Sequence, residues 1–457
     1  MSQVTGDFSQ GNIRSIILKL GIPIVAAEFV HIFYNLVDRM YIGHMPGTGT
    51  AALTGVGIVF PLITFINSFA ELFGVGGAPL SAIARGEKDN EKAERIMETS
   101  FSALVLIGTL LTLVLLCFAP LLVRLMGGEK EAGVHALAYF RVYALGTVPV
   151  LLCLGMNPFI NSLGFSRTGM LTVVIGAVLN TILDPILIYA FHLGVTGAAI
   201  ATVISQTISA GWVILFLTSS RPPLKIRRLH ISLSCLKPIM KLGITGFTFK
   251  TTTSITQAVV NLTLRKWGGV LSMFFVSAAS IINSLREVIN LPVLGMTQGA
   301  EAVMSFNYGA KKYDRVLDTI RFIFSLSLSV NTAIWGLLMI FPQIFISIFT
   351  SDGQLIGISV KCLRLFFGIY PFMAMQMTGQ HTFVALNHPQ KALLFSMFRK
   401  VILVVPLTVF LPYTGLGVYG VFAAEMLSQL IGASACFATM ILTVARGLKR
   451  SQTSNCP

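Results

Sequence analysis

A succession of apolar runs, each long enough to cross a lipid bilayer, dominates this chain. A membrane-spanning helix needs about 20 mainly apolar residues. The candidate runs lie at residues 14–43, 52–84, 95–118, 136–158, 167–192, 195–217, 238–264, 271–306, 316–341, 359–386, 391–413 and 417–445. They are continuous and do not alternate, which excludes a transmembrane β-barrel. The sequence therefore predicts an all-α polytopic membrane protein with 12 transmembrane helices.

The composition excludes the soluble classes of protein. Hydrophobic residues make up 54% of the 457 and charged residues only 11%, whereas a soluble domain carries about 25% charged residues. A soluble enzyme, a nucleic-acid reader and a disordered chain are all excluded by this shortage of polar surface. The net charge of +15 does not indicate a nucleic-acid partner, because the basic residues stand in short loops between apolar runs.

The basic residues predict the orientation in the membrane. With a cytoplasmic N-terminus, 23 of the 33 Lys and Arg residues fall inside and five fall outside. The inside set is Arg14, Lys19, Arg85, Lys88, Lys92, Arg95, Arg167, Arg221, Lys225, Arg227, Arg228, Lys237, Lys241, Lys311, Lys312, Arg315, Arg321, Lys391, Arg399, Lys400, Arg446, Lys449 and Arg450. The outside set is Arg39, Arg124, Lys130, Arg265 and Lys266. This bias predicts a multi-pass protein of the cell inner or plasma membrane with both termini cytoplasmic.

The sequence also repeats itself. The run Lys-Leu-Gly-Ile at residues 19–22 recurs at 241–244, an offset of 222, and Ser205-Gln206 recurs at 428–429, an offset of 223. Each half holds six spans, so both halves enter from the same side and are related by a pseudo-twofold axis along the membrane normal. We therefore expect an N-terminal six-helix lobe at 1–220, a cytoplasmic linker at 221–237, and a C-terminal six-helix lobe at 238–457 with a short basic tail.

Polar residues that only one half contains are the better functional candidates, because symmetric residues mostly serve the shared fold. When the two halves are aligned by the repeat, four polar residues of the first half match residues of a different type in the second. The pairs are Asp38 and Val260, Asn180 and Leu403, Asp184 and Leu407, and Thr202 and Glu425. The first half therefore holds a polar set that the second half has largely lost.

This polar set has the chemistry of a cation site. Asn180 and Asp184 are four residues apart and share one face of a helix. Two carboxylates that are close together at membrane depth cannot both stay charged cheaply, so the pair holds a proton or a cation bridges it. Asn180 and Thr202 add neutral oxygens that suit a Na⁺ shell or a hydrogen-bond network. A purely structural polar pair, and a Thr202 that bonds only to its own helix, remain open alternatives.

At these positions the chain resembles a known family. The runs Tyr34-Asn35-Leu36-Val37-Asp38, Phe73-Gly74-Val75-Gly76 and Asn180-Thr181-Ile182-Leu183-Asp184-Pro185, with Gly194-Val195-Thr196-Gly197, are similar to those of the multidrug and toxic compound extrusion (MATE) family. The resemblance covers essentially the whole chain. The motif that contains Asp184 looks most like the branch of staphylococcal-type multidrug exporters.

The resemblance implies export of organic cations and drugs in exchange for inward H⁺ or Na⁺, with no other cofactor. It also implies that the family's N-lobe cation site, including any Na⁺ site, lies at Asp38, Asn180, Asp184 and Thr202. The chain departs from a branch that uses acids in spans 238–264 and 359–386. Neither span contains an acid here. The first offers Lys250 and the second Gln376, Gln380 and His381, so a C-lobe cation site of that type is not expected.

A second set of residues is expected to line a central substrate cavity. Glu28 and Lys250 stand at matched positions of the repeat, so if one lines the cavity the other should too. Asn35 and Glu287 complete the set. The opposite charges of Glu28 and Lys250 could pair across the lobes, or Glu28 could contact a cationic substrate. Alternatively, each could pair within its own lobe.

The sequence thus predicts a secondary active antiporter that works as a monomer by rocker-switch alternating access. Its partners are small organic cations or drugs and the lipid bilayer. One alternative is a lipid-linked saccharide flippase, whose cavity should carry Arg and Lys, whereas the candidate midplane charges here are mostly acidic. Another is a membrane-embedded enzyme, but we find no catalytic motif in the sequence, so we expect the protein not to be an enzyme.

Overall fold

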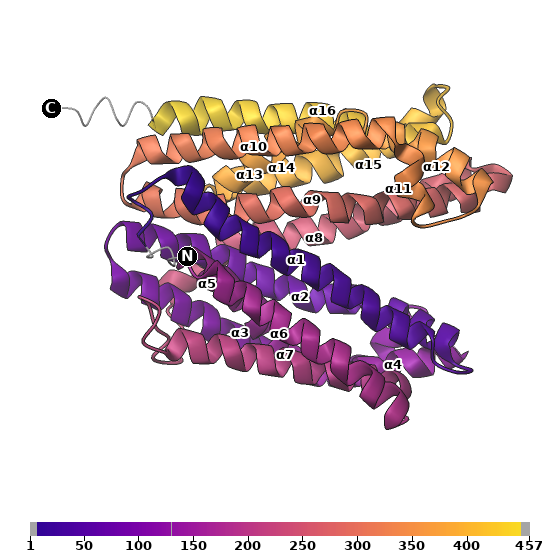
Figure 1. Ribbon diagram of the computed structural model, residues 1–457, viewed down its shortest axis with the longest axis horizontal. Helices are drawn as coiled ribbons and strands as arrows, with labels where there is room; N and C mark the ends of the chain where they lie inside the picture. The colour runs from indigo at the N-terminus through magenta and orange to yellow at the C-terminus, as the bar shows by residue number, and fades with distance from the viewer. Residues whose placement is uncertain (1–6, 129, 449–457) are drawn as a thin grey trace. The chain divides into compact units, whose positions relative to one another are not determined.

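The computed structural model describes residues 7–128 and 130–448, and over these residues the regular structure is entirely helical (Figure 1). The chain divides into two compact units. Unit 1 holds residues 19–247 together with the segment that precedes Gly11. Unit 2 holds Gly11–Leu18 and the chain from Thr248 onwards. The division therefore falls inside a helix that the sequence assigns to the second lobe.

Unit 1 is built from the first seven α-helices and the start of the eighth. They are α1 (Ile13–Gly43, whose first turn belongs to unit 2), α2 (Gly49–Gly86), α3 (Asn90–Leu125), α4 (Lys130–Leu145), α5 (Thr147–Ser162), α6 (Ser166–Pro185), the π-helix η1 (Ile186–Ala190), α7 (Gly194–Thr218) and the start of α8 (Leu233–Trp267).

Unit 2 is more often interrupted. After the rest of α8 it contains η2 (Gly269–Leu271), α9 (Ser272–Gly309), α10 (Tyr313–Ile340), α11 (Pro342–Ser347), α12 (Gly353–Phe366), η3 (Tyr370–Phe372), α13 (Met373–Ala385), α14 (Pro389–Met397), the π-helix η4 (Phe398–Val404), α15 (Val405–Phe410), η5 (Leu411–Thr414), α16 (Tyr419–Thr439) and the π-helix η6 (Met440–Ala445).

The helices account for the spans that the sequence predicts. In the described residues, nine helices are long and apolar enough to cross a membrane, and two bent pairs raise the number to as many as eleven. The bends are 61° between α4 and α5 and 47° between α12 and the segment η3–α13. The remaining predicted span corresponds to α8, which has 35 residues and many threonines. The all-α polytopic fold is confirmed.

Glycines in unit 1 allow its helices to approach closely. A Cβ atom on Gly74 would lie 2.6 Å from the carbonyl oxygen of Gly155, and one on Gly197 would lie 2.7 Å from the backbone of Leu187. Gly194 has a φ angle of 56°, which favours glycine. Small residues at such contacts let membrane helices pack backbone against backbone.

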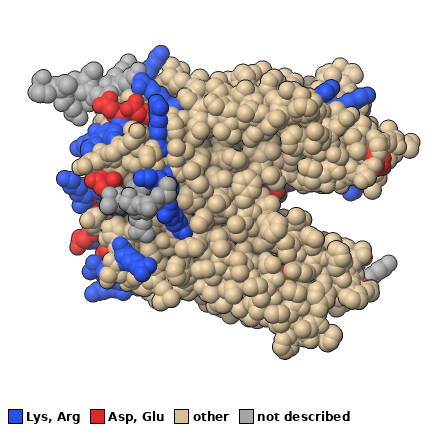
Figure 2. Space-filling model, viewed as in Figure 1, with Lys and Arg blue, Asp and Glu red and all other residues tan. Residues whose placement is uncertain are grey.

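The segment between α7 and α8 is held to the start of α3 by acidic side chains. The backbone N–H groups of Arg227 and Arg228 donate to Glu98 Oε1 at 2.9 and 3.2 Å, and that of Lys225 donates to Glu94 Oε1 at 3.2 Å. On the face in view, Figure 2 shows Lys and Arg gathered mainly at the helix ends, while the long sides of the helices are largely uncharged. This distribution suits helices whose middle parts face lipid.

Candidate functional site

The four polar residues that distinguish the first half meet inside unit 1. Asn180 and Asp184 come from α6, Asp38 from α1 and Thr202 from α7. One helical turn separates Asn180 from Asp184, so the Asn180 amide nitrogen donates to Asp184 Oδ1 at 3.1 Å. The same amide lies 3.4 Å from the Thr202 hydroxyl, which also donates to its own helix at Ala198 O (3.0 Å). Thr202 therefore serves both the site and its helix.

Asp38 completes the cluster. Its side chain lies near that of Asp184, close enough for the two carboxyl groups to interact, although the two residues are far apart in sequence. Asp184 is fully buried, and Asn180 is nearly so. Two ionised carboxylates repel each other at such proximity, so the arrangement calls for a proton or a cation between them.

Three oxygen atoms of this cluster have unused hydrogen-bonding capacity. Asp38 Oδ1, Asn180 Oδ1 and Asp184 Oδ2 are buried and find no donor among the described residues. Buried polar atoms are normally satisfied, and leaving one unsatisfied costs about 1–3 kcal/mol. A bound cation or proton would relieve this cost. Among the described residues, this cluster included, no group of three or more His, Cys, Asp and Glu is placed to hold a metal ion.

Two tyrosines lie near Asp38, and the comparison of the two halves did not select them as site residues. Tyr34 and Tyr139 lie near Asp38, and Tyr139 also lies near Thr202. The rings of Tyr139 and Tyr143 stack with centroids 6.2 Å apart. Tyr34 stands four residues before Asp38 on the same helix, so its spacing could have revealed it. The other two lie on α4, and only the tertiary structure brings them to the site.

Pro185 shapes the end of the helix that carries the site. Proline lacks the backbone N–H that a regular helix needs at this position. Directly after it, α6 widens into the π-helix η1, a local distortion that is frequent at functional sites. Tyr189 of this segment donates its hydroxyl hydrogen to the carbonyl oxygen of Tyr41 at 2.6 Å. The distorted segment is therefore fastened to the helix that carries Asp38.

The four candidate cavity residues divide between the units. Glu28 and Asn35 belong to unit 1, where Glu28 is half-buried and the Asn35 amide donates to His31 O at 2.7 Å. Glu287 belongs to unit 2 and is exposed. The side chain of Lys250 lies outside the described residues. Their assignment to a substrate cavity remains a prediction.

In the span 359–386, where another branch of the family uses an acid, the polar side chains bond to residues that are close in space. His381 Nδ1 lies 2.8 Å from Glu301 Oε2, and the Gln376 amide donates to Gln380 Oε1 at 3.0 Å. The Gln380 amide in turn donates to the Ser396 hydroxyl. These neutral and paired groups do not form an acidic cation site.

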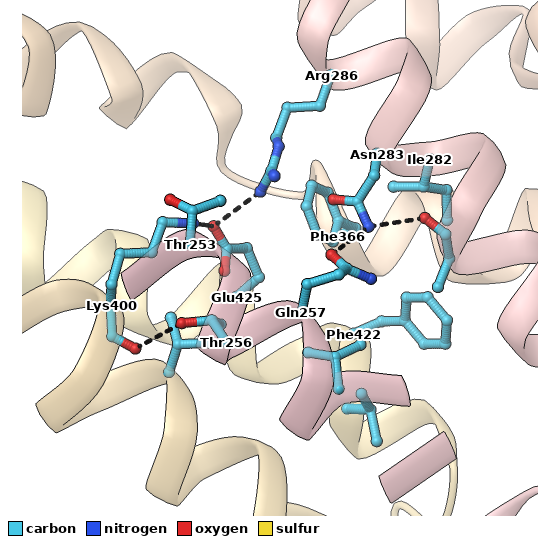
Figure 3. Close-up of a pocket in the computed structure, with 14 residues that line it drawn as sticks. Thr253, Thr256, Gln257, Ile282, Asn283, Arg286, Phe366, Lys400, Phe422 and Glu425 are labelled. Carbon is cyan, nitrogen blue, oxygen red and sulfur yellow. Dashed lines mark hydrogen bonds and ion pairs between the residues drawn. The ribbon is translucent and has the colours of Figure 1, made fainter. Parts of the chain in front are cut away.

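Unit 2 instead contains a basic pocket, which the sequence did not predict. Three basic side chains converge on Glu425, the repeat counterpart of Thr202. Its Oε1 atom lies 2.9 Å from Arg399 Nη1, 3.5 Å from Lys400 Nζ and 3.7 Å from Arg286 Nη1. Figure 3 shows Arg286 and Lys400 directed toward Glu425 from different elements.

Two of these cations also correct the count of cytoplasmic charges. Arg399 and Lys400 were placed inside the cell, but each is only 4% exposed within η4, in the middle of the span Pro389–Thr414. A basic residue in that position contributes to a buried ion cluster and cannot be counted as a loop charge. Their position within the predicted span 391–413 already indicated a place at membrane depth, which the charge count did not take into account.

The basic pocket encloses a cavity of about 30 Å³. Polar residues line one part of it and apolar residues the other. The lining consists of Thr253, Thr256, Gln257, Val260, Ala279, Ile282, Asn283, Arg286, Phe366, Lys400, Val404, Val421, Phe422 and Glu425. Val260 and Glu425 are the repeat counterparts of Asp38 and Thr202. The pocket thus occupies the region of unit 2 that corresponds to the cation cluster of unit 1.

An all-helical membrane fold with a repeated half and a buried polar cluster is the architecture of a transporter. The MatE family model matches residues 23–186 and matches again at 251–410, which together make up well over half of the chain. The chain therefore belongs to the MatE family, that of the multidrug and toxic compound extrusion transporters. Members of this family are membrane transporters and not enzymes, and they need no cofactor.

Known proteins agree with this assignment. The chain is 23% identical over 361 residues to the multidrug export protein MepA of Staphylococcus haemolyticus (strain JCSC1435), covering 78% of each chain. A crystal structure of MATE in complex with MaL6 superimposes with a TM-score of 0.89 at 25% identity, covering 98% of this chain and 100% of that one. The outward-facing conformation of a multidrug resistance MATE family transporter gives the same TM-score and coverage at 24% identity.

Proposed function

We propose that this protein is a secondary active antiporter that exports organic cations or drugs, and that the cluster of Asp38, Asn180, Asp184 and Thr202 binds the coupling ion. The observation that carries the proposal is the cluster's three buried oxygen atoms, Asp38 Oδ1, Asn180 Oδ1 and Asp184 Oδ2, which find no donor among the described residues. Such a cluster changes its charge when it gains or loses one cation. A cation that binds the inward- and outward-facing states unequally shifts their populations, and this shift drives alternating access.

The proton is the coupling ion that the geometry supports best. A single proton shared between two carboxyl groups needs no further ligand and removes their repulsion. Na⁺ is the second candidate, because Asp38 Oδ1, Asn180 Oδ1 and Asp184 Oδ2 are buried without donors. Hard cations prefer several oxygen ligands, and the Thr202 hydroxyl, which donates its hydrogen to Ala198 O, would add only one more oxygen to these three. Na⁺ would therefore need added ligands, such as water.

The drug-export proposal takes its substrate class from the relatives, which are multidrug export proteins. The flippase alternative gains no support from them. The distribution of basic residues supports an orientation with both termini in the cytoplasm, and this conclusion does not depend on Arg399 and Lys400. Without those two residues the inside set still outnumbers the outside set about fourfold.

Transport in proteoliposomes tests the proposal. A fluorescent organic cation is loaded, and its movement is followed under an imposed pH gradient alone and then under a Na⁺ gradient alone. We expect movement with the pH gradient and little with the Na⁺ gradient. A response to Na⁺ alone would replace the proton by Na⁺, and transport that ignores both gradients would refute antiport.

A further inference from the structure

We propose that the basic pocket of unit 2 is an anion-binding site that takes one small negative charge, either a halide ion or the carboxylate group of a transported compound. This inference goes beyond the proposed function and does not rest on it. Every residue of the basic pocket belongs to unit 2, whereas the ion-coupling residues belong to unit 1.

The first argument is the imbalance of buried charge. Three basic side chains converge on one carboxylate oxygen, that of Glu425. Arg399 and Lys400 are each 4% exposed, and Glu425 is 7% exposed. Among the described residues, the basic groups outnumber the acidic ones even if Glu287, the exposed neighbour of Arg286, is counted. A buried charge that lacks a counter-charge is expensive, and an anion would supply one.

The second argument is the distances. Only Arg399 reaches Glu425 at 2.9 Å, a normal length for a charge-assisted hydrogen bond. Lys400 at 3.5 Å and Arg286 at 3.7 Å are held more loosely. These two loosely held cations line the cavity, and Arg399 does not. Arg286 and Lys400 are therefore the pair available to a ligand in the cavity (Figure 3).

The third argument is the size and character of the cavity. About 30 Å³ holds one or two groups of the size of a water molecule. A halide ion or one carboxylate group fits, and a whole organic molecule does not. Val260, Val421 and Phe422 line the same space and lower its dielectric constant, which strengthens the attraction to an anion. The Arg286 guanidinium also lies 5.6 Å from the ring centroid of Phe366, which limits its orientations.

The fourth argument is that the backbone makes room for the cations. Arg399 and Lys400 lie in the π-helix η4, whereas the same stretch of unit 1 is regular α-helix with Gly176 and Ala177 at the matching positions. The stem of Arg399 passes over Gly432, where a Cβ atom would lie 2.9 Å from Arg399 Cγ. The second half thus places two cations where the first half has none.

The experiment measures anion binding to the full chain purified in detergent. The thermal midpoint is recorded while sodium chloride or sodium acetate is titrated, because a ligand that binds the folded state raises it. The variants are Lys400→Gln and Arg286→Gln, which remove one cavity cation each, and Glu425→Gln, which removes the competing carboxylate. Lys361→Gln is the matched control, since Lys361 is an exposed cation of the same unit.

We expect a saturable rise in the wild type and in Lys361→Gln. Loss of either cavity cation should weaken the apparent affinity by about tenfold or more, and Glu425→Gln should tighten it. If one of the two cation variants fails to fold, the other still tests the proposal. A response to chloride alone identifies a halide site, and a response to acetate identifies a carboxylate site. If both salts act alike on the wild type, the control and the cation variants, the effect is one of bulk salt and the proposal is overturned.

Discussion

The two halves of this transporter contain corresponding polar sites of opposite charge. The cluster in unit 1 brings two carboxylates together without a basic partner among the hydrogen bonds and ion pairs that the described residues show. The basic pocket in unit 2 brings three cations to one carboxylate. The two sites share two pairs of repeat positions. Asp38 corresponds to Val260, and Thr202 corresponds to Glu425. A repeated fold can therefore keep its helices while its two halves carry polar clusters of opposite charge.

The largest expected effect is the loss of coupling in unit 1. Asp184→Asn should lower ion-driven efflux by about 5- to 150-fold, the usual range of a coupling free energy, because the amide cannot bind a proton. Asp38→Asn should behave alike, since the two carboxyl groups form one site. Efflux rate against external pH and Na⁺ in proteoliposomes measures this.

The control for these variants is Asp318→Asn, which alters an exposed carboxylate paired with Arg321. It should leave ion dependence unchanged. Glu425→Gln should weaken transport at most, because its carboxylate is already paired with cations. If Glu425→Gln abolished the ion dependence while both unit 1 variants kept it, the coupling site would lie in the other half.

A glycine substitution tests how tightly the basic pocket is built. Gly432→Ala should place a methyl group against the stem of Arg399 and destabilise the protein by about 1–3 kcal/mol. Gly336→Ala is the matched control in the same unit, because a Cβ atom there meets nothing within 4 Å. Thermal midpoints in detergent compare the two. Equal midpoints would mean that Arg399 can move aside freely and that Gly432 does not position it.

A smaller effect is expected at Thr202. Thr202→Val keeps the shape but removes the hydroxyl that lies 3.4 Å from the Asn180 amide. A neutral hydrogen bond contributes about 0.5–1.5 kcal/mol, so efflux should fall only severalfold. Rates measured beside those of Asp184→Asn provide the comparison. A loss as large as that of Asp184→Asn would make Thr202 an essential ligand, as a Na⁺ site requires.

The last prediction tests on which side of the membrane the segment that joins the two halves lies. Residues 221–237 should be cytoplasmic, because five basic residues cluster there. An impermeant thiol reagent added to intact cells should not label Cys235, a half-buried residue near the start of α8. The same reagent should label it in inverted vesicles. Labelling from outside the cell would invert the topology.

The sequence by itself determined the helical membrane fold and the members of the unit 1 cluster. Apolar runs of sufficient length leave the backbone no alternative to helices, because its polar groups must be satisfied within the span. Asn180 and Asp184 could be paired because a helix places residues four apart on one face. The internal repeat then singled out Asp38, whose counterpart is Val260, and Thr202, whose counterpart is Glu425, as polar residues that differ between the halves.

Only the tertiary structure shows which side chains from different helices meet at each site. The tyrosines of α4 reach the carboxylates only through helix packing. Lys400 and Arg286 are more than a hundred residues apart, and Arg399 was counted with the cytoplasmic charges although it lies inside a predicted span. Helix packing places them on one oxygen of Glu425 in unit 2. Charge partners across helices depend on side-chain direction and depth, which periodicity does not encode.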